Sequence, residues 1–169
     1  IELGTPARLK AQMDSVAMLE DHRVAFNKIA FTKKTKTLTK EEWLKHIHVI
    51  RCWDSGHGGL AQSAFRQAQG TKWYANVGLH KVSHTQDGSF VLHRETTVGW
   101  RMVVHKAKVF DAINEAHVLV AHRRVASTKN QLQEKYENIQ ENLVKQCIQS
   151  CTVCNEIQRH MTKDTRAID

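Results

Sequence analysis

Apolar residues recur at helical spacing along most of the chain, and a short stretch of alternating residues interrupts this pattern near the middle. Between residues 6 and 31 apolar side chains return every three or four positions, which predicts a long amphipathic helix. Thr5 is a suitable N-cap for it, and Pro6 suits the first helical position. Its predicted buried face carries Leu9, Met13, Val16, Leu19, Val24 and Phe26.

A second helix is predicted over residues 41–53, "EEWLKHIHVIRCW". Thr39 and Glu42 stand at the spacing of a capping box, in which each side chain bonds the backbone N–H of the other residue. "DSGHGG" at 54–59 ends this helix, and residues 60–70 predict a short third one. One face of the second helix would carry Trp43, Ile47 and Ile50.

The period of the pattern changes from helical to alternating after residue 78. Residues 79–97, "LHKVSHTQDGSFVLHRETT", form two alternating segments joined by Asp87-Gly88. This dipeptide between alternating segments is a strong hairpin signal. Residues 100–106, "WRMVVHK", add a third strand candidate, so we expect a small antiparallel β ribbon.

Helical spacing then returns for the rest of the chain. The predicted helices span residues 109–117, 127–136 and 138–151. Ser127 or Thr128 could cap the second of these, and Asn138 with Glu141 predicts a capping box for the third. The predicted fold class is therefore mainly α with a small antiparallel β ribbon.

Three regions follow from these changes of pattern. We expect a helical region at 1–78 with no role that the sequence reveals, a β-hairpin or three-strand extension at 79–106, and a helical unit at 107–162. The chain begins with Ile1 and not with Met, so we expect it to be a fragment of a longer protein.

The charge of the chain favours an anionic partner. Lys and Arg number 25 against 17 Asp and Glu, which gives a net charge of +8 with His neutral. Such a balance is typical of nucleic-acid-binding proteins, although a solvated basic surface without a partner is the open alternative. No apolar run has the length of a membrane span, and the first residues do not resemble a secretory signal. We therefore expect an intracellular protein that does not bind membranes.

Two histidines and a Cys-x-x-Cys pair carry the candidate chemistry. His117 and His122 would point about 140° apart on an unbroken helix, so the helix must end near His117 for both to face one ion. Cys151 and Cys154 can face a common point from a helix end. Two imidazole and two thiolate ligands form a closed, tetrahedral zinc (Zn2+) site of the structural kind.

Other interpretations of these residues stay open at this point. The His pair could be core packing, and a lone Cys-x-x-Cys could be a redox motif, although no βαβ pattern surrounds this one. Cys147 either competes as a ligand or packs in the core beside Leu143 and Val144. A closed four-ligand site has no open position for water, so we expect neither catalysis nor a small-molecule substrate.

Three stretches resemble the amino-terminal HHCC zinc-binding domain of retroviral and retrotransposon integrases. They are "VVHKAKVFDAINEAH", the following "AH", and "STKNQLQEKYENIQENLVKQCIQSCTVCNE". The resemblance covers about residues 101–158. It departs from the family at Ala121, where the family commonly has Gly before its second His. Some such integrases carry a small sheet ahead of the zinc unit, to which residues 79–95 would correspond.

The resemblance implies a structural zinc held by His117, His122, Cys151 and Cys154 in a three-helix unit. It also implies a nuclear, DNA-binding and oligomerising module that in the family precedes a separate RNase H-like core for DNA integration. This fragment would then bind DNA without cutting or joining it. The alternative is a structural or protein-protein interaction module with a structural zinc and no role in nucleic-acid binding.

Phosphate contacts are expected from basic residues next to the zinc unit, because Lys and Arg release counterions when they neutralise phosphates. The candidates are Lys106 and Lys108 before the first helix of the unit, Arg123 and Arg124 after His122, and Lys129 at the start of the next helix.

Overall fold

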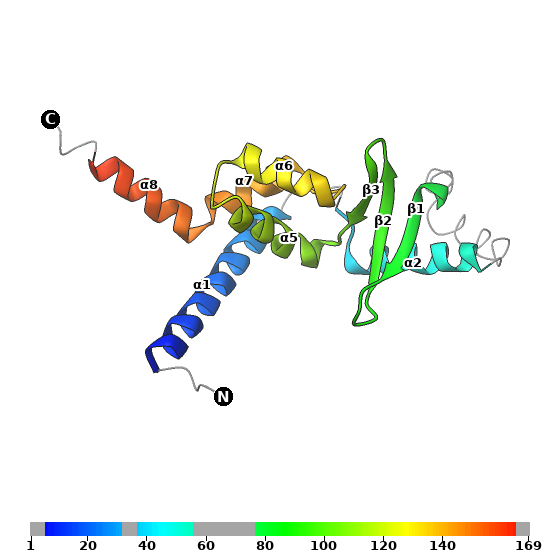
Figure 1. Ribbon diagram of the computed structural model, residues 1–169, viewed down its shortest axis with the longest axis horizontal. Coiled ribbons are helices and arrows are strands. Elements are labelled where there is room, and N and C mark those ends of the chain that lie inside the picture. The colour runs from blue at the N-terminus through cyan, green and yellow to red at the C-terminus, as the bar shows by residue number, and fades with distance from the viewer. Residues whose placement is uncertain (1–5, 32–36, 56–76, 165–169) are drawn as a thin grey trace. The chain divides into compact units, whose positions relative to one another are not determined.

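The computed structural model describes residues 6–31, 37–55 and 77–164, and these form helices and one three-stranded antiparallel sheet (Figure 1). The helices are α1 (Pro6–Ala30), α2 (Lys40–Asp54), a 3-10 turn (Val77–Leu79), α5 (Lys106–Leu119), α6 (Val125–Lys135), α7 (Glu141–Gln149) and α8 (Thr152–Asp164). The strands are β1 (His80–His84), β2 (Phe90–Thr96) and β3 (Gly99–Val103). The predicted fold class, mainly α with a small antiparallel β ribbon, is confirmed.

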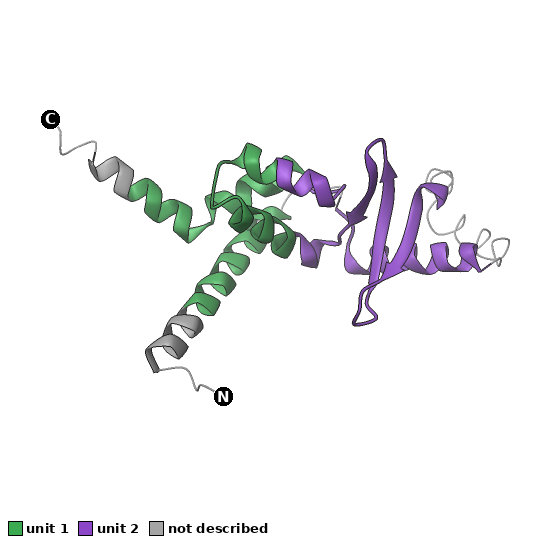
Figure 2. Ribbon diagram, in the orientation of Figure 1, with its two compact units in different colours: residues 1–35, 110–129, 140–169 green, residues 36–109, 130–139 purple. Residues whose placement is uncertain are grey.

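The chain forms two compact units (Figure 2). Unit 1 comprises residues 1–35, 110–129 and 140–169, and unit 2 comprises residues 36–109 and 130–139. The proposed division at residues 78 and 106 stays a prediction, because compactness alone does not establish independent folding. The Thr5 cap and the predicted helix at 60–70 lie outside the described residues.

In unit 2 the sheet has the order β1-β2-β3, and one of its faces packs on α2. Val82, Leu92 and Val103 stand opposite one another across the three strands. They complete an apolar core with Ile47, Ile50 and Val77. The predicted hairpin is confirmed, with Gly88 at φ +80 in its turn, where the absence of a Cβ permits a positive φ.

The capping box of α2 is confirmed. Thr39 accepts a hydrogen bond from the backbone N–H of Glu42, and the Glu42 carboxylate accepts one from the backbone N–H of Thr39. The indole of Trp43 then donates a 2.8 Å hydrogen bond to the carbonyl of Val103. This bond links the helix to β3, so the predicted inner face of α2 is the one that meets the sheet.

Residues 136–138, which follow α6, run beside β3. Glu137 donates a backbone hydrogen bond to the Met102 carbonyl at 3.0 Å. The Asn138 amide bonds both the N–H and the carbonyl of Val104, at 3.1 and 2.7 Å. The capping box predicted for Asn138 and Glu141 is therefore wrong, because the Asn138 side chain pairs with the chain after β3 and Gln140 occupies the N-cap of α7.

Unit 1 packs α1 against α5 and α7. Phe26 is fully buried, with its ring centroid 5.6 Å from that of Phe110, and Arg23 pairs with Asp111 at 2.9 Å. The buried stripe of α1 within the described side chains is His22, Phe26 and Ala30. The predicted face is wrong at Val16, Leu19 and Val24, which are exposed, since tertiary packing selects the stripe next to Phe110.

The ends of α5 and α6 also differ from the prediction. Lys106 and Lys108 lie in the first turn of α5 and do not precede it. Ser127 and Thr128 lie inside α6 and do not cap it, because the carbonyl of Arg124 accepts the first backbone hydrogen bonds of that helix. Among the described residues, no helix combines the length and the apolar character needed to cross a membrane.

Candidate metal centre

The chain reverses after α5 in a Schellman motif, the hydrogen-bonded turn that often closes a helix. The N–H of His122 donates to the carbonyl of His117 at 3.0 Å, and the N–H of Ala121 donates to that of Val118 at 2.9 Å. Ala121 and His122 have φ values of 53° and 56°. The helix therefore ends two residues after His117, at Leu119, and the turn brings the His122 ring back beside the His117 ring.

The two cysteines occupy the start of α8. Cys151 lies between α7 and α8, and its carbonyl accepts the N–H of Asn155, while Cys154 sits in the first turn of α8. This position brings both sulfur atoms within 3.9 Å of the Nδ1 of His122.

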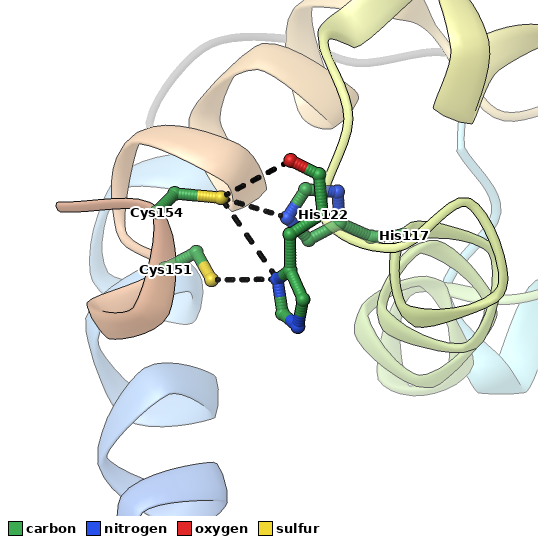
Figure 3. Close-up of side chains that lie close together, drawn as sticks. All are labelled: His117, His122, Cys151 and Cys154. Atoms are coloured by element: carbon green, nitrogen blue, oxygen red, sulfur yellow. Dashed lines mark hydrogen bonds between the residues drawn. The ribbon is translucent and has the colours of Figure 1, made fainter. Parts of the chain in front are cut away.

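The four side chains converge on one point (Figure 3). The Nε2 of His117 lies 3.1 Å from the Sγ of Cys154, and the Nδ1 of His122 lies 3.5 Å from the Sγ of Cys151 and 3.9 Å from that of Cys154. In a tetrahedral zinc site, neighbouring N and S ligands stand about 3.6 Å apart. The ligand atoms all lie within 4.8 Å of one another, so the set fits a metal ion of that size.

Thr128 of α6 orients the first imidazole. Its hydroxyl lies 3.2 Å from the Nδ1 of His117, and both side chains are fully buried. A hydrogen bond at Nδ1 leaves Nε2, the nitrogen that faces Cys154, available to a metal. Thr128 is thus a positioning residue that the helical pattern did not reveal.

The pKa values reflect the crowding of these groups. Burial, with smaller contributions from His122 and His22, lowers the pKa of His117 to about 4. Burial and the neighbouring Cys151 raise the pKa of Cys154 to about 11. The environment thus favours a neutral imidazole, which is the ligating form, and opposes a thiolate unless a cation offsets its charge.

Cys147 packs in the core beside the centre. It is fully buried, and burial first and Cys151 second raise its pKa to about 12. The Nε2 of His22 donates to the Cys147 carbonyl at 2.8 Å and lies 3.7 Å from its Sγ. Cys147 does not belong to the set of four converging side chains, which confirms the core interpretation, and His22 is a neighbour that no sequence spacing indicated.

The basic residues proposed for phosphate contacts fall in different places. Arg123 and Arg124 are exposed directly after His122 in unit 1. The Lys129 ammonium donates a 2.6 Å hydrogen bond to Glu141. This bond, with a second contribution from Lys145, lowers the pKa of Glu141 to about 2. Lys106 and Lys108 belong to unit 2, so the structure does not gather all five residues in one unit.

In comparisons with known proteins, the chain matches no protein-family model, no curated protein and no solved structure.

Proposed function

We propose that the chain is a zinc-stabilised, nucleic-acid-binding and self-associating module of an integrase-like, retroelement-derived protein, and that it is non-catalytic by itself. The observation that carries this proposal is the convergence of His117, His122, Cys151 and Cys154 on one point. Two imidazoles with two thiolates are a ligand set that suits zinc.

The zinc would have a structural role in this proposal. The four residues would complete its coordination and join the end of α5 to the start of α8. Because a small helical unit buries limited apolar surface, such a link would supply a large part of its stability, on the order of 10 kcal/mol for structural zinc sites. A closed set leaves no position for a reacting water, which supports a non-catalytic role.

Charge supports the nucleic-acid part of the proposal. The chain carries a net charge of +8, and two adjacent guanidinium side chains, Arg123 and Arg124, are exposed beside the proposed zinc ligand His122. Contacts from these side chains to phosphates would be independent of base sequence. A nuclear location would follow from this role.

Binding of a labelled DNA duplex at increasing salt concentrations tests the proposal. We expect affinity to fall steeply with salt, and the Arg123→Gln/Arg124→Gln variant to bind more weakly with a salt slope reduced by about 1 to 2. Lys28→Gln, which removes one exposed charge from α1, is the matched control and should change binding little. Equal binding by the Arg variant and the control, or no binding at low salt, would contradict the proposal.

A second candidate function is a protein-interaction module with the same structural zinc. Val153 and Ile157, four residues apart on α8, are 37% and 50% exposed, and exposed apolar side chains at this spacing are typical of a helix that packs on a partner. Self-association that persists at high salt and is lost in Val153→Ser/Ile157→Ser, without DNA binding, would favour this candidate.

A further inference from the structure

Three basic side chains form a single row across the sheet of unit 2. His80 stands opposite Arg94, and Arg94 stands opposite Arg101, so the row crosses β1, β2 and β3 on the same face as Leu92 and Val103. Like charges directly opposite one another destabilise a sheet. Arg94 and Arg101 are always protonated, so they are the like-charged pair of this row, and a nearby carboxylate would offset their repulsion.

The compensation within the described residues is incomplete. The carboxylate of Glu137 lies 3.8 Å from a guanidinium nitrogen of Arg94 and 3.8 Å from one of Arg101. Both distances exceed that of a hydrogen bond, so neither guanidinium donates to it. Among the described residues, neither guanidinium has a carboxylate oxygen within hydrogen-bond distance, so the forked donors of both are open to a ligand.

These side chains line an open pocket at the end of the sheet. It has a volume of about 650 Å³, and its lining carries two guanidiniums, Arg94 and Arg101, and two carboxylates, Glu95 and Glu137. The other lining residues are Leu79, Thr96, Thr97 and Val98. The side chain of Arg101 is 22% exposed and that of Arg94 is 45% exposed, so both guanidiniums can be reached from solvent.

We propose that Arg94 and Arg101 form a phosphate-binding site, which takes the phosphate group either of a nucleic-acid strand or of a free phosphate ester. The planar guanidinium fork matches two phosphate oxygens, and two forks from opposite residues would hold one group from two sides. Glu137 partly offsets the charge of the two guanidiniums when the site is empty, and its carboxylate would repel a bound phosphate. This proposal depends neither on the metal centre nor on Arg123 and Arg124.

The alternative is that Glu137 completes a purely structural charge triad. The Glu137→Gln substitution separates the two interpretations, because it removes the competing charge but keeps the size of the side chain. A phosphate site should then bind its ligand about fivefold more tightly, since a unit charge at this distance in water contributes an effect of that order. A structural triad would lose stability without gaining affinity for phosphate.

The experiment titrates the full chain with inorganic phosphate at constant ionic strength and follows the Nε–H signals of the arginines by NMR. A fluorescein-labelled single-stranded oligonucleotide is titrated in parallel. We expect Arg94 and Arg101 signals to shift with phosphate, and Arg94→Gln or Arg101→Gln to weaken binding roughly tenfold. Arg51→Gln on α2, whose guanidinium stacks on Phe90, is the matched control.

The outcomes distinguish the source of the phosphate. If the variants change the affinity for the oligonucleotide as well, the ligand is a nucleic-acid backbone, and if only inorganic phosphate responds, the ligand is a free phosphate ester. The proposal is overturned if phosphate leaves the Arg94 and Arg101 signals unmoved in the native chain. It is also overturned if Glu137→Gln binds phosphate no better than Arg51→Gln does.

Discussion

Ala121 adopts a backbone conformation that disfavours residues with a Cβ. At φ 53° it lies in the left-handed region, which costs an L-residue about 1–2 kcal/mol. The following residue shares the conformation, and this pair turns the chain so that the His122 ring meets the His117 ring. Backbone strain of this kind persists only where the surrounding structure imposes it. Here the strained turn holds the candidate ligand His122 in position.

Replacing Ala121 with Gly should therefore stabilise the chain. We expect a gain of about 0.5–1 kcal/mol, because relief of the left-handed strain exceeds the extra entropy that Gly brings to the unfolded state. Urea denaturation followed by circular dichroism measures the change. The same substitution at Ala126, a helical position in α6, should destabilise instead, and a loss of stability in Ala121→Gly would contradict this account.

Thr128 should influence metal affinity without touching the metal. Thr128→Val keeps the shape of the side chain but removes the hydroxyl beside the Nδ1 of His117. Loss of such a partner typically lowers metal affinity 10–100-fold, so we expect a decrease of about that size in competition with a chelator. Ser127→Ala, one residue earlier in α6, is the control, and equal affinities for the two variants would rule out the positioning role.

The four converging residues could be predicted at the residue scale because their types and spacing are visible in the sequence. His117 and His122 cannot share a target on a continuous helix, so a helix end was required, and the structure has one at Leu119. Thr128 could not be predicted in this role, because its contact with His117 depends on how α6 packs beside α5.

At the scale of elements, local signals predicted structure where no tertiary partner competed. The Thr39–Glu42 capping box is an exposed, local feature and formed as predicted. The capping box predicted from Asn138 did not form, because its side chain bonds Val104. Thr128 does not cap α6, because the helix begins before it and its side chain contacts His117. Long-range contacts of this kind leave no periodic mark in the sequence.

The buried His46 makes the stability of unit 2 depend on pH. Burial first and the nearby His80 second lower the pKa of His46 from an ordinary value of 6.5 to about 4. The unfolded state then binds a proton more readily than the folded state between these values. The stabilisation is complete above pH 6.5 and is lost as the pH falls towards 4.

Between pH 7 and pH 5 this effect amounts to about 2 kcal/mol. When the pH falls from 7 to 5, the unfolding free energy of the native chain should therefore decrease by about 2 kcal/mol more than that of His46→Gln. All four tryptophans lie within residues 36–109, so tryptophan fluorescence during urea denaturation reports on unit 2. His48 is an exposed neighbour, and His48→Gln should behave like the native chain. If the native chain and His46→Gln lose the same unfolding free energy, His46 is not the source of the pH dependence.

At the scale of the whole molecule, the proposed zinc belongs to unit 1, and the basic row with its pocket belongs to unit 2. Composition and periodicity predicted the fold class, but they did not predict that α1 packs beside α5 and α7, because exposed and buried apolar residues of α1 look alike in the sequence. The central proposal is that a zinc ion held by the four converging residues stabilises unit 1.

The measurement that tests this claim most directly is the zinc content per chain of the native protein, of Cys154→Ser and of Cys52→Ser, with thermal melting of each. Cys52 lies on α2 in unit 2 and is the matched control. We predict about one zinc per native chain, loss of the metal and a lower melting temperature in Cys154→Ser, and retention of both the metal and the native melting temperature in Cys52→Ser. A native chain without zinc, with three proteins that melt alike, would contradict the account.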